Sequence, residues 1–474
     1  MKIKRTIILA ILIVFSAAAI CAQKGETKEK LEKVNRLMER LTAEGFSGAV
    51  LVASDGRVSS NGYGYADREK KIKCTPHTIF STGSITKPLT ATAVLKLEMA
   101  GKLSVEDKLS RFFQDLPADK RDITIHQLLT HSAGLPDSLG RDYEPLEKEA
   151  FLRRAFAAPL IFKPGTEYEY SNVGFSILAA IIEKVSGQPY EEYLYKNVFL
   201  PAGMKNTGYS LPDWKDEDLA VGYLGDERWG KMTDQSHKKP EMYWNLLGNG
   251  GILSSVEDLY KFHLALKGET ILSEGEKEKQ YRPYIKEGPD ADSFYGYGWS
   301  IVPTPRNTNL ITHNGGNGIF FADFWRYPQE DLVVIVMTNS LKKEYRDLAR
   351  EIALTMLLPD YNSTLTTKID HAYDDLDQHP DGQMIKNFIK TVRSGDPKMI
   401  ESLVEQNFAD GLKNAAPIKD HIGGLTRVGK EIKDLEVGSI TVKGSETAVN
   451  FKNSPLRLLL RIVNGKIQGI GISD

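Results

Sequence analysis

The chain has 474 residues, of which 41% are hydrophobic and 26% are charged, and its formal net charge is −2 at pH 7. This length is about three domains' worth of chain, and the composition is that of a folded protein rather than a disordered one. The near-neutral charge excludes the strongly basic surface that a nucleic-acid partner requires.

The first residues predict export from the cytoplasm. The stretch "MKIKRTIILAILIVFSAAAICAQKG" has early basic residues, then an apolar run, then small residues, which is typical of a secretory signal peptide over residues 1–22. The apolar run is too short for a comfortable membrane span. Lipid attachment at Cys21 is the alternative, but Ile20 is bulkier than the small residue expected before a lipidated cysteine. We expect a periplasmic or secreted protein with no stable membrane span after cleavage.

Residues 28–45 and 46–67 predict an amphipathic helix followed by a hairpin that turns at Asp55-Gly56. Much later, residues 317–340 predict two more strands, and residues 343–358 a helix that Pro359 stops. The fold class we expect is α/β in the α+β sense. One antiparallel sheet, from residues near 46–66 and 295–340, is flanked by the two helices, and residues 80–290 supply a mostly helical subdomain.

A second unit is expected at the end of the chain. Residues 359–379 are polar and rich in breaking residues, which indicates a linker between a domain at 26–358 and one at 380–474. The last stretch contains two helical segments around Gly395, then strands with alternating apolar residues and an Asn464-Gly465 hairpin turn. It weakly resembles NTF2-like or cystatin-like α+β modules.

The cysteines give no sign of a disulfide or a metal site. Cys21 lies at the edge of the signal peptide, which leaves Cys74 alone in the mature chain. No cysteine–histidine spacing resembles a zinc site and HExxH is absent. We expect neither a metal nor another cofactor.

Ser84 and Lys87 stand together at the start of an apolar helix. In "FSTGSITKPLTATAVLKLEMAGKLS", nearly every side of the helix is apolar, so it should be buried. Positions i and i+3 are neighbours on a helix. Desolvation and the positive helix end both favour the neutral form of the lysine amine, and a neutral amine can take the proton of a serine nucleophile. An N-cap serine with a lysine that reaches to water is the alternative.

Ser-x-x-Lys occurs twice more, and context separates the three copies. Ser236–Lys239 lies in a charged loop and Ser340–Lys343 enters a polar stretch, so both are expected to be solvated surface. Tyr-x-Asn also occurs three times. Tyr170–Asn172 follows a Pro-Gly loop and opens a buried helix. Tyr195–Asn197 lies on an amphipathic helix, where the tyrosine is expected to pack, and Tyr243–Asn245 is the alternative pair that could line a cleft.

The ordered set of motifs resembles the serine beta-lactamase family in its broad sense, which includes class C beta-lactamases, DD-peptidases and related esterases. The pieces that carry the resemblance cover about residues 30–358: "SGAVLVASDG", "FSTGSITKPLTA", "ITIHQLLTHSAGLPD", "PGTEYEYSNVGFSILAAIIEKVSG", "FLPAGMKNTGY", "GNGGILSSVEDLYKF", "YGYGWSI" and "ITHNGGNGIFFADFWRYPQEDLVVIVMTNS".

The resemblance implies a role for each matching residue. Ser84 would be the acylated nucleophile, Lys87 would assist its deprotonation, and Tyr170 would be a general base or proton relay whose pKa the lysine lowers. Asn172 would hold the substrate's amide or carbonyl, and the backbone N–H groups of Ser84 and Gly316 would form the oxyanion hole. Whether lysine or tyrosine takes the proton stays open.

The third motif departs from the family's frequent Lys-Thr-Gly. Here His313-Asn314-Gly315 stands in that place, so a fixed cation becomes a mostly neutral imidazole. The glycines would let the backbone approach the substrate. A packing histidine is the alternative for His313, and His131 is expected to be structural. If His313 contacts the substrate, anionic substrates should gain on neutral ones as the pH falls towards about 6.

The expected function is therefore a secreted serine hydrolase that cleaves small esters or D-amino-acid peptides. A beta-lactamase or a penicillin-binding DD-carboxypeptidase is one alternative, and a catalytically silent binding or sensor protein is another. Its partner would be a small-molecule or peptide substrate. The sequence leaves the oligomeric state open.

Overall fold

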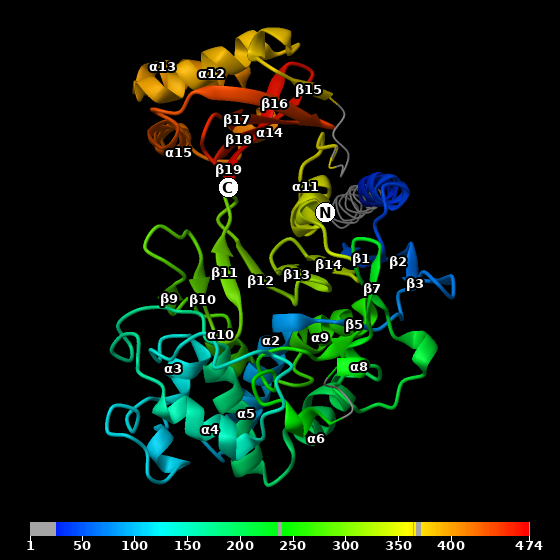
Figure 1. Cartoon of the computed structure of the whole chain (residues 1–474), viewed down its shortest axis with the longest axis vertical. Coiled ribbons are helices and arrows are strands. Elements are labelled where there is room, and N and C mark those ends of the chain that lie inside the picture. Colours follow the sequence, from blue (N-terminus) through cyan, green and yellow to red (C-terminus); the bar gives the residue numbers. More distant parts are fainter. Residues whose placement is uncertain (1–24, 236–238, 364, 366–370, 474) are drawn as a thin grey trace, which may run out of the picture. The chain divides into compact units, whose positions relative to one another are not determined.

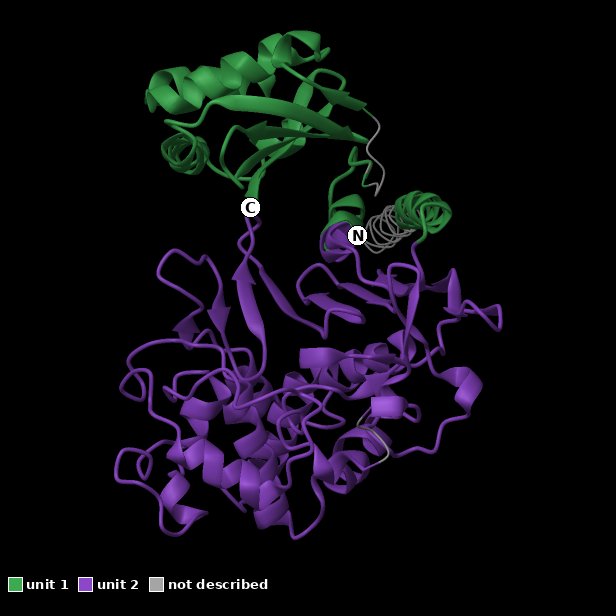
Figure 2. Cartoon of the chain, in the orientation of Figure 1, with its two compact units in different colours: residues 1–45, 350–474 green, residues 46–349 purple. Residues whose placement is uncertain are grey.

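The computed structural model describes residues 25–235, 239–363, 365 and 371–473, and these form two compact units. One unit is residues 46–349, and the other contains the described parts of 1–45 and 350–474 (Figure 2). The predicted signal peptide and Cys21 lie outside the described residues. The domain predicted from the sequence, residues 26–358, differs from the larger unit because it also includes the N-terminal helix and residues 350–358.

The larger unit contains the predicted antiparallel sheet, which has eight strands among the described residues, in the order β2-β1-β14-β13-β12-β11-β10-β9 (Figure 1). Strand β1 pairs with β14 from Gly48↔Thr338 to Ser54↔Leu332, so the two ends of the domain close on each other as expected. The strands are β1 (Gly48–Ser54), β2 (Arg57–Tyr63), β9 (Ile285–Lys286), β10 (Phe294–Tyr295), β11 (Ser300–Pro303), β12 (Asn309–Gly316), β13 (Phe321–Tyr327) and β14 (Leu332–Thr338).

In the sequence, the chain between β2 and β9 forms mainly helices and long loops, also as predicted (Figure 1). The helices are α2 (Thr86–Met99), α3 (Ile125–Leu129), α4 (Lys148–Ala157), α5 (Asn172–Ser186), α6 (Tyr190–Leu194), α7 (Leu200–Ala202), α8 (Met232–Gln235), α9 (Val256–Lys267) and α10 (Glu274–Gln280). Short paired strands link them: β3 (Tyr65–Asp67) with β4 (Ile72–Lys73), β5 (Phe80–Ser81) with β8 (Leu253–Ser254), and β6 (Gly222–Leu224) with β7 (Glu227–Gly230).

Helix α2 is the buried centre of the unit. All its residues from Thr86 to Leu95 are buried, and so is Leu97, because the helix is apolar or hydroxyl-bearing on every side. Its hydroxyls are satisfied inside the protein: the Oγ1 of Thr90 donates to the carbonyl of Gly248 at 2.6 Å. Helix α2 therefore gives the residues at its N-terminus a rigid base.

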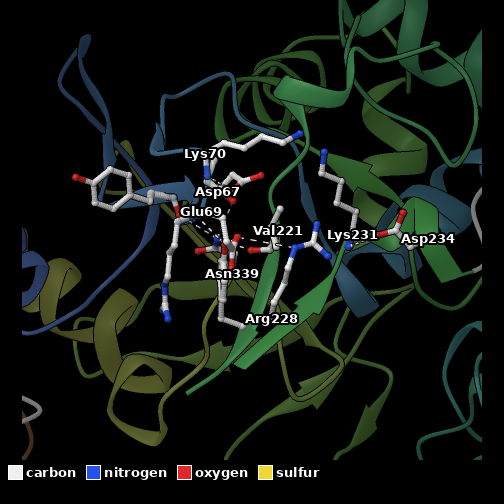
Figure 3. A network of polar contacts seen from close by, with 12 residues as sticks. Asp67, Glu69, Lys70, Val221, Arg228, Lys231, Asp234 and Asn339 are labelled. Carbon is white, nitrogen blue, oxygen red and sulfur yellow. Dashed lines mark hydrogen bonds and ion pairs between the residues drawn. The ribbon is translucent and has the colours of Figure 1, made fainter. Parts of the chain in front are cut away.

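A network of polar contacts surrounds the residues that directly follow β14 (Figure 3). The side-chain amide of Asn339 donates to the carbonyls of Val221 at 2.7 Å and Tyr65 at 3.1 Å. The Nη2 of Arg68 donates to the Oγ of Ser340 at 3.1 Å. Ser340 is only 3% exposed, so the expectation that it is solvated surface is wrong. Ser236, the other copy, lies outside the described residues.

The smaller unit includes a helical segment over residues 25–43 and α11 (Leu348–Leu357), which begins in the larger unit. Its α+β part has helices α12 (Gly382–Ser394), α13 (Pro397–Asn407), α14 (Asp410–Lys413) and α15 (Ile418–Glu431). Its sheet has the order β15-β16-β17-β18-β19, with strands at His371–Tyr373, Val437–Lys443, Glu446–Phe451, Arg457–Val463 and Lys466–Ser473. Asn464 and Gly465 have φ of 51° and 68°, as the predicted turn requires.

Strand β15 lies inside the segment predicted to be a linker, and it pairs with β16. The polar composition of that segment concealed the strand, because its residues His371 and Ala372 are exposed and give no apolar alternation. The exact domain boundaries stay a prediction.

Candidate active site

Ser84 lies in a short 3₁₀ turn, Gly83–Ile85, that leads directly into α2. The loop at residues 248–252 holds this turn on both sides. The backbone N–H of Thr82 donates to the carbonyl of Ile252 at 2.9 Å, and the N–H of Ile252 donates to the Oγ1 of Thr86 at 3.2 Å. Ser84 itself stays partly exposed, so its hydroxyl is fixed in place and still accessible.

Lys87 is fully buried directly behind Ser84. Its Nζ lies 3.1 Å from the Oγ of Ser84, 2.7 Å from the Oδ1 of Asn172 and 2.8 Å from the carbonyl oxygen of Asn249. The predicted i, i+3 pair is therefore in hydrogen-bond contact. The alternative, a lysine that reaches to water, does not describe this side chain.

Burial lowers the pKa of Lys87 well below its usual value, because the charged amine would lose its hydration there. The negative charges of Asp137 and Asp142 act in the opposite direction. Desolvation is the larger effect, so the amine is favoured in its neutral form, in which it can accept a proton.

Tyr170 lies beside this pair. Its phenol is hydrogen-bonded with Ser84, and the Nζ of Lys87 lies 4.5 Å from the centre of its ring. Burial raises the pKa of Tyr170, and the hydrogen bond with Ser84 only partly offsets this effect. The expectation that the lysine lowers this pKa is therefore wrong for the free protein: a neutral lysine supplies no charge to stabilise a phenolate.

The ring of His131 packs against the ring of Tyr170, in line with the structural role expected for His131. Its ring centre lies 4.4 Å from that of Tyr170, and its Nδ1 accepts a hydrogen bond at 3.0 Å from the backbone N–H of Ser171. His131 is 1% exposed, and burial holds its pKa well below the usual value. The ring is thus a neutral packing surface and does not compete with Lys87 for a proton.

Asn172 begins α5 and connects Lys87 to a carboxylate. Its Oδ1 accepts from the Nζ of Lys87, and its Nδ2 donates to the Oδ1 of Asp137 at 2.9 Å. The backbone N–H of Asn172 donates to the carbonyl of Asp137 at 2.9 Å. Two bonds to one residue fix the amide's orientation, so that its oxygen faces the lysine.

Gly315 and Gly316 bring the end of β12 against the serine turn. A Cβ on Gly315 would lie 2.2 Å from the backbone nitrogen of Ser84, and one on Gly83 would lie 2.4 Å from the nitrogen of Gly316. Gly83 also has a φ of +51°. Only glycine permits backbones this close, so the glycines of β12 are what lets this strand pack directly against the turn that carries Ser84.

His313 is buried beside the site, and both of its ring nitrogens are occupied. Its Nδ1 lies 2.6 Å from the carbonyl oxygen of Asn314, and its Nε2 lies 2.9 Å from the Oη of Tyr295. A carbonyl only accepts, so Nδ1 carries the proton and Nε2 accepts from Tyr295. Burial lowers the pKa of His313 to about 3. The expected gain of charge near pH 6 is therefore wrong for the free protein.

Three groups at the site were missed by the sequence analysis: the carbonyl of Asn249, the carboxylate of Asp137 and the phenol of Tyr295. Asn249 is held in place by its own side chain, which donates to the Oγ of Ser176 and the carbonyl of Asn245, each at 2.8 Å. Asn245, from the alternative Tyr-x-Asn pair, thus supports the loop. A backbone carbonyl leaves no side-chain signal in a sequence, so only the glycine-rich "GNGG" pointed to this loop.

Replacement of Asp137 by asparagine tests the electrostatics of Lys87. The charge of Asp137 raises the pKa of Lys87, so its removal should lower that pKa further. If the neutral amine takes the serine proton, the acid limb of the kcat/KM profile should move to lower pH. Asp142→Asn is the matched control and should shift the limb the same way by less. A shift to higher pH would contradict this account.

The described residues contain no cluster of three or more histidine, cysteine or acidic side chains that could hold a metal ion. Within the same residues, no helix is both long and apolar enough to cross a membrane. Cys74 is buried, and burial raises the pKa of its thiol to about 12, so it is not a reactive nucleophile near neutral pH.

A serine at the start of a buried helix, a lysine one turn on and a Tyr-x-Asn pair beside an antiparallel sheet define a serine hydrolase of the beta-lactamase and transpeptidase type. The chain belongs to the beta-lactamase family, whose family model matches residues 34–357. This is a family of serine hydrolases, and the predicted resemblance and fold are confirmed.

Three relatives illustrate the similarity. Penicillin-binding protein 4* of Bacillus subtilis is 29% identical over 62% of this chain and 68% of its own length. The putative penicillin-binding protein PbpX of the same species is 33% identical over 60% and 69%. Among solved structures, a penicillin-binding protein from Bacillus halodurans is 30% identical, with a TM-score of 0.58 over 68% of this chain and 99% of its own.

Two more distant structures share the fold alone. The D-amino acid amidase of Ochrobactrum anthropi is 22% identical, with a TM-score of 0.60 over 70% of this chain and 98% of its own. An octameric penicillin-binding protein homologue from Pyrococcus abyssi is 24% identical, with a TM-score of 0.61 over 92% of this chain and 94% of its own.

Proposed function

We propose that the protein hydrolyses small neutral esters or amides, including those of D-amino acids and their peptides, through an acyl-enzyme on Ser84. The observation that carries the proposal is the hydrogen-bonding of the buried Lys87. A neutral amine has two N–H groups and one lone pair. Two of its three neighbours, the Oδ1 of Asn172 and the carbonyl of Asn249, can only accept. The lone pair is then left for the hydroxyl of Ser84, 3.1 Å away.

This arrangement makes Lys87 the proton acceptor in acylation. The Ser84 Oγ–H bond breaks, its proton moves to Nζ, and Oγ bonds to the substrate's carbonyl carbon. The carbonyl oxygen then carries the negative charge, which the backbone N–H groups of Ser84 and Gly316 would stabilise. The phenol of Tyr170 stays protonated because its pKa is raised, so it can donate its proton to the leaving atom and take one from Lys87 in return; the bond from the carbonyl carbon to the leaving atom breaks as the carbonyl re-forms. In deacylation a water molecule takes the place of the leaving group, and the same proton transfers run in reverse until Ser84 is free again.

The charges around the site favour substrates without a carboxylate. His313 stands where a lysine would hold a substrate carboxylate, and it is neutral, with both ring nitrogens occupied by the protein. The nearest charges acting on Lys87 are those of Asp137 and Asp142, which are negative. A carboxylate placed here would lose its hydration without a cationic partner.

A substrate panel tests the proposal on purified residues 23–474. We expect p-nitrophenyl butyrate and D-phenylalaninamide to be turned over at least tenfold more efficiently than nitrocefin, whose carboxylate is unpaired in the site. Because the pKa of His313 is about 3, the ratio of the efficiency for p-nitrophenyl butyrate to that for nitrocefin should stay constant between pH 5 and pH 8, as should the imidazole resonance of His313. His313→Gln is the control for a role in binding.

Two alternatives give different results on the same panel. The names of the relatives favour a penicillin-binding protein, and efficient nitrocefin hydrolysis, unchanged in His313→Gln, would show that the carboxylate is held elsewhere. A silent binder or sensor would be acylated once and release no further product, which a burst without steady turnover would reveal.

We also propose that the protein acts in the periplasm or outside the cell. The support is the signal-peptide pattern of residues 1–22. N-terminal sequencing of protein recovered from the cell envelope should begin at Gln23. A lipid-modified Cys21 at the N-terminus would favour the lipoprotein alternative, and an intact Met1 would contradict both.

A further inference from the structure

A second cavity lies in the larger unit, away from Ser84, with a volume of about 810 Å³. Its walls come from α9, α10 and the strands β11, β12 and β13, and they include the apolar side chains of Leu266, Ile301 and Ile311. Neither Ser84 nor Lys87 lines it.

Arg326 on β13 lines this cavity and is only 3% exposed. Its Nε donates to the Nδ1 of His263 at 3.1 Å, and its Nη1 donates to the Oη of Tyr281 at 2.7 Å. Both acceptors are neutral: burial, with the charge of Arg326, lowers the pKa of His263 to about 3. The guanidinium also lies over the ring of Trp299, at 5.2 Å.

No carboxylate forms an ion pair with Arg326 anywhere in the part of the chain that the structure describes. A guanidinium has five N–H donors, so the two hydrogen bonds leave three that no described protein group accepts. A buried charge without a partner is costly, and proteins nearly always pair one. An arginine that lines a cavity and has N–H groups without acceptors can form two parallel hydrogen bonds to the two oxygens of an anion.

Most of the other charged residues of the lining are paired. Five basic residues and three acidic ones line the cavity: Lys267 pairs with Asp331, Lys277 pairs with Glu274 at 2.6 Å, and Lys279 pairs with Glu98 and Glu276, which lie outside the lining. Arg282, exposed at the cavity, forms no ion pair with any described carboxylate. The cavity therefore has an apolar wall, a buried guanidinium and a net positive charge.

We propose that this cavity binds a small organic anion, whose carboxylate or phosphate group pairs with Arg326 and whose apolar body packs on Leu266, Ile301 and Ile311. The apolar wall accounts for the organic part of the ligand, because a free inorganic ion would leave it in contact with water. The site is separate from catalysis, so it adds a ligand to the protein whether or not the proposed reaction is correct.

Calorimetric titration of the purified protein tests the site with phenylacetate, phenyl phosphate and the neutral phenylacetamide. We expect at least one of the two anions to bind at millimolar concentration or below, and at least tenfold more tightly than the amide. The stronger of the two identifies the head group. Arg326→Gln should weaken the anion by tenfold or more, and Arg326→Lys by less, since it keeps the charge but loses the fork.

Ser84→Ala should leave the anion's affinity unchanged, which separates this site from the catalytic one. Arg282→Gln, on an exposed residue, should weaken binding about two- to fivefold without risk to folding, and it decides the question if Arg326→Gln does not fold. Absence of anion binding, equal binding of phenylacetamide, or affinities unchanged in the arginine variants would overturn the proposal.

Discussion

Ser84→Ala should abolish turnover, with a loss of roughly 10⁴–10⁶-fold in kcat, because loss of a serine nucleophile removes the covalent path altogether. A fluorophosphonate probe should label the wild type on Ser84 and leave the variant unlabelled. Folding should be unaffected, since the side chain is partly exposed and the turn is held by Thr82 and Thr86.

Ser340→Ala is the matched control, because Ser340–Lys343 has the same spacing in the sequence. Ser340 is buried and accepts a hydrogen bond from Arg68, so its loss should reduce stability while labelling and turnover persist. Labelling that survives in Ser84→Ala, or disappears in Ser340→Ala, would refute the assignment of the nucleophile.

The architecture was predictable where one local pattern had one structural solution. Asp55-Gly56 and Asn464-Gly465 require positive φ and so specify hairpins, which the structure contains. The apolar surround of Ser84 and Lys87 predicted burial, and the i, i+3 spacing predicted their contact. Tyr170 and Asn172 were found through their place at the start of a buried helix and through the resemblance.

What the sequence could not predict depends on contacts between distant segments. The neutral state of His313 results from its burial, and its Nε2 is occupied by the phenol of Tyr295, which is 18 residues earlier in the chain. The sequence also gives no sign that Arg326 on β13 bonds to His263 and Tyr281, which come from separate segments of the chain. Periodicity reports which face of an element is buried, but not which polar groups meet there.

The raised pKa of Tyr170 is a further example. A nearby cation would lower the pKa of a phenol, but the desolvation that raises the pKa of Tyr170 also favours the neutral form of Lys87. Two titratable groups that share one desolvated site cannot be assigned separately from sequence, since each pKa depends on the charge of the other.

This coupling leads to the second large expected effect. Lys87→Met, which nearly keeps the side-chain volume, and Tyr170→Phe, which removes only the hydroxyl, should each lower kcat by about 10²–10⁴-fold, since each interrupts positioned proton transfer. Circular dichroism should show both variants folded. Tyr195→Phe, in another Tyr-x-Asn copy, is the control and should retain full activity.

The double variant distinguishes one proton path from two. Both Lys87 and Tyr170 contact the hydroxyl of Ser84, so the proton that leaves Ser84 passes through one connected set of groups. Once either group is lost, the proton path from Ser84 to the leaving group is already interrupted, so removal of the other group should then cost little. The loss in Lys87→Met/Tyr170→Phe should therefore be close to that of the worse single variant. A loss equal to the product of the two single losses would show that the lysine and the tyrosine act in separate steps, and Lys87 would then need another route for its proton to reach the leaving group.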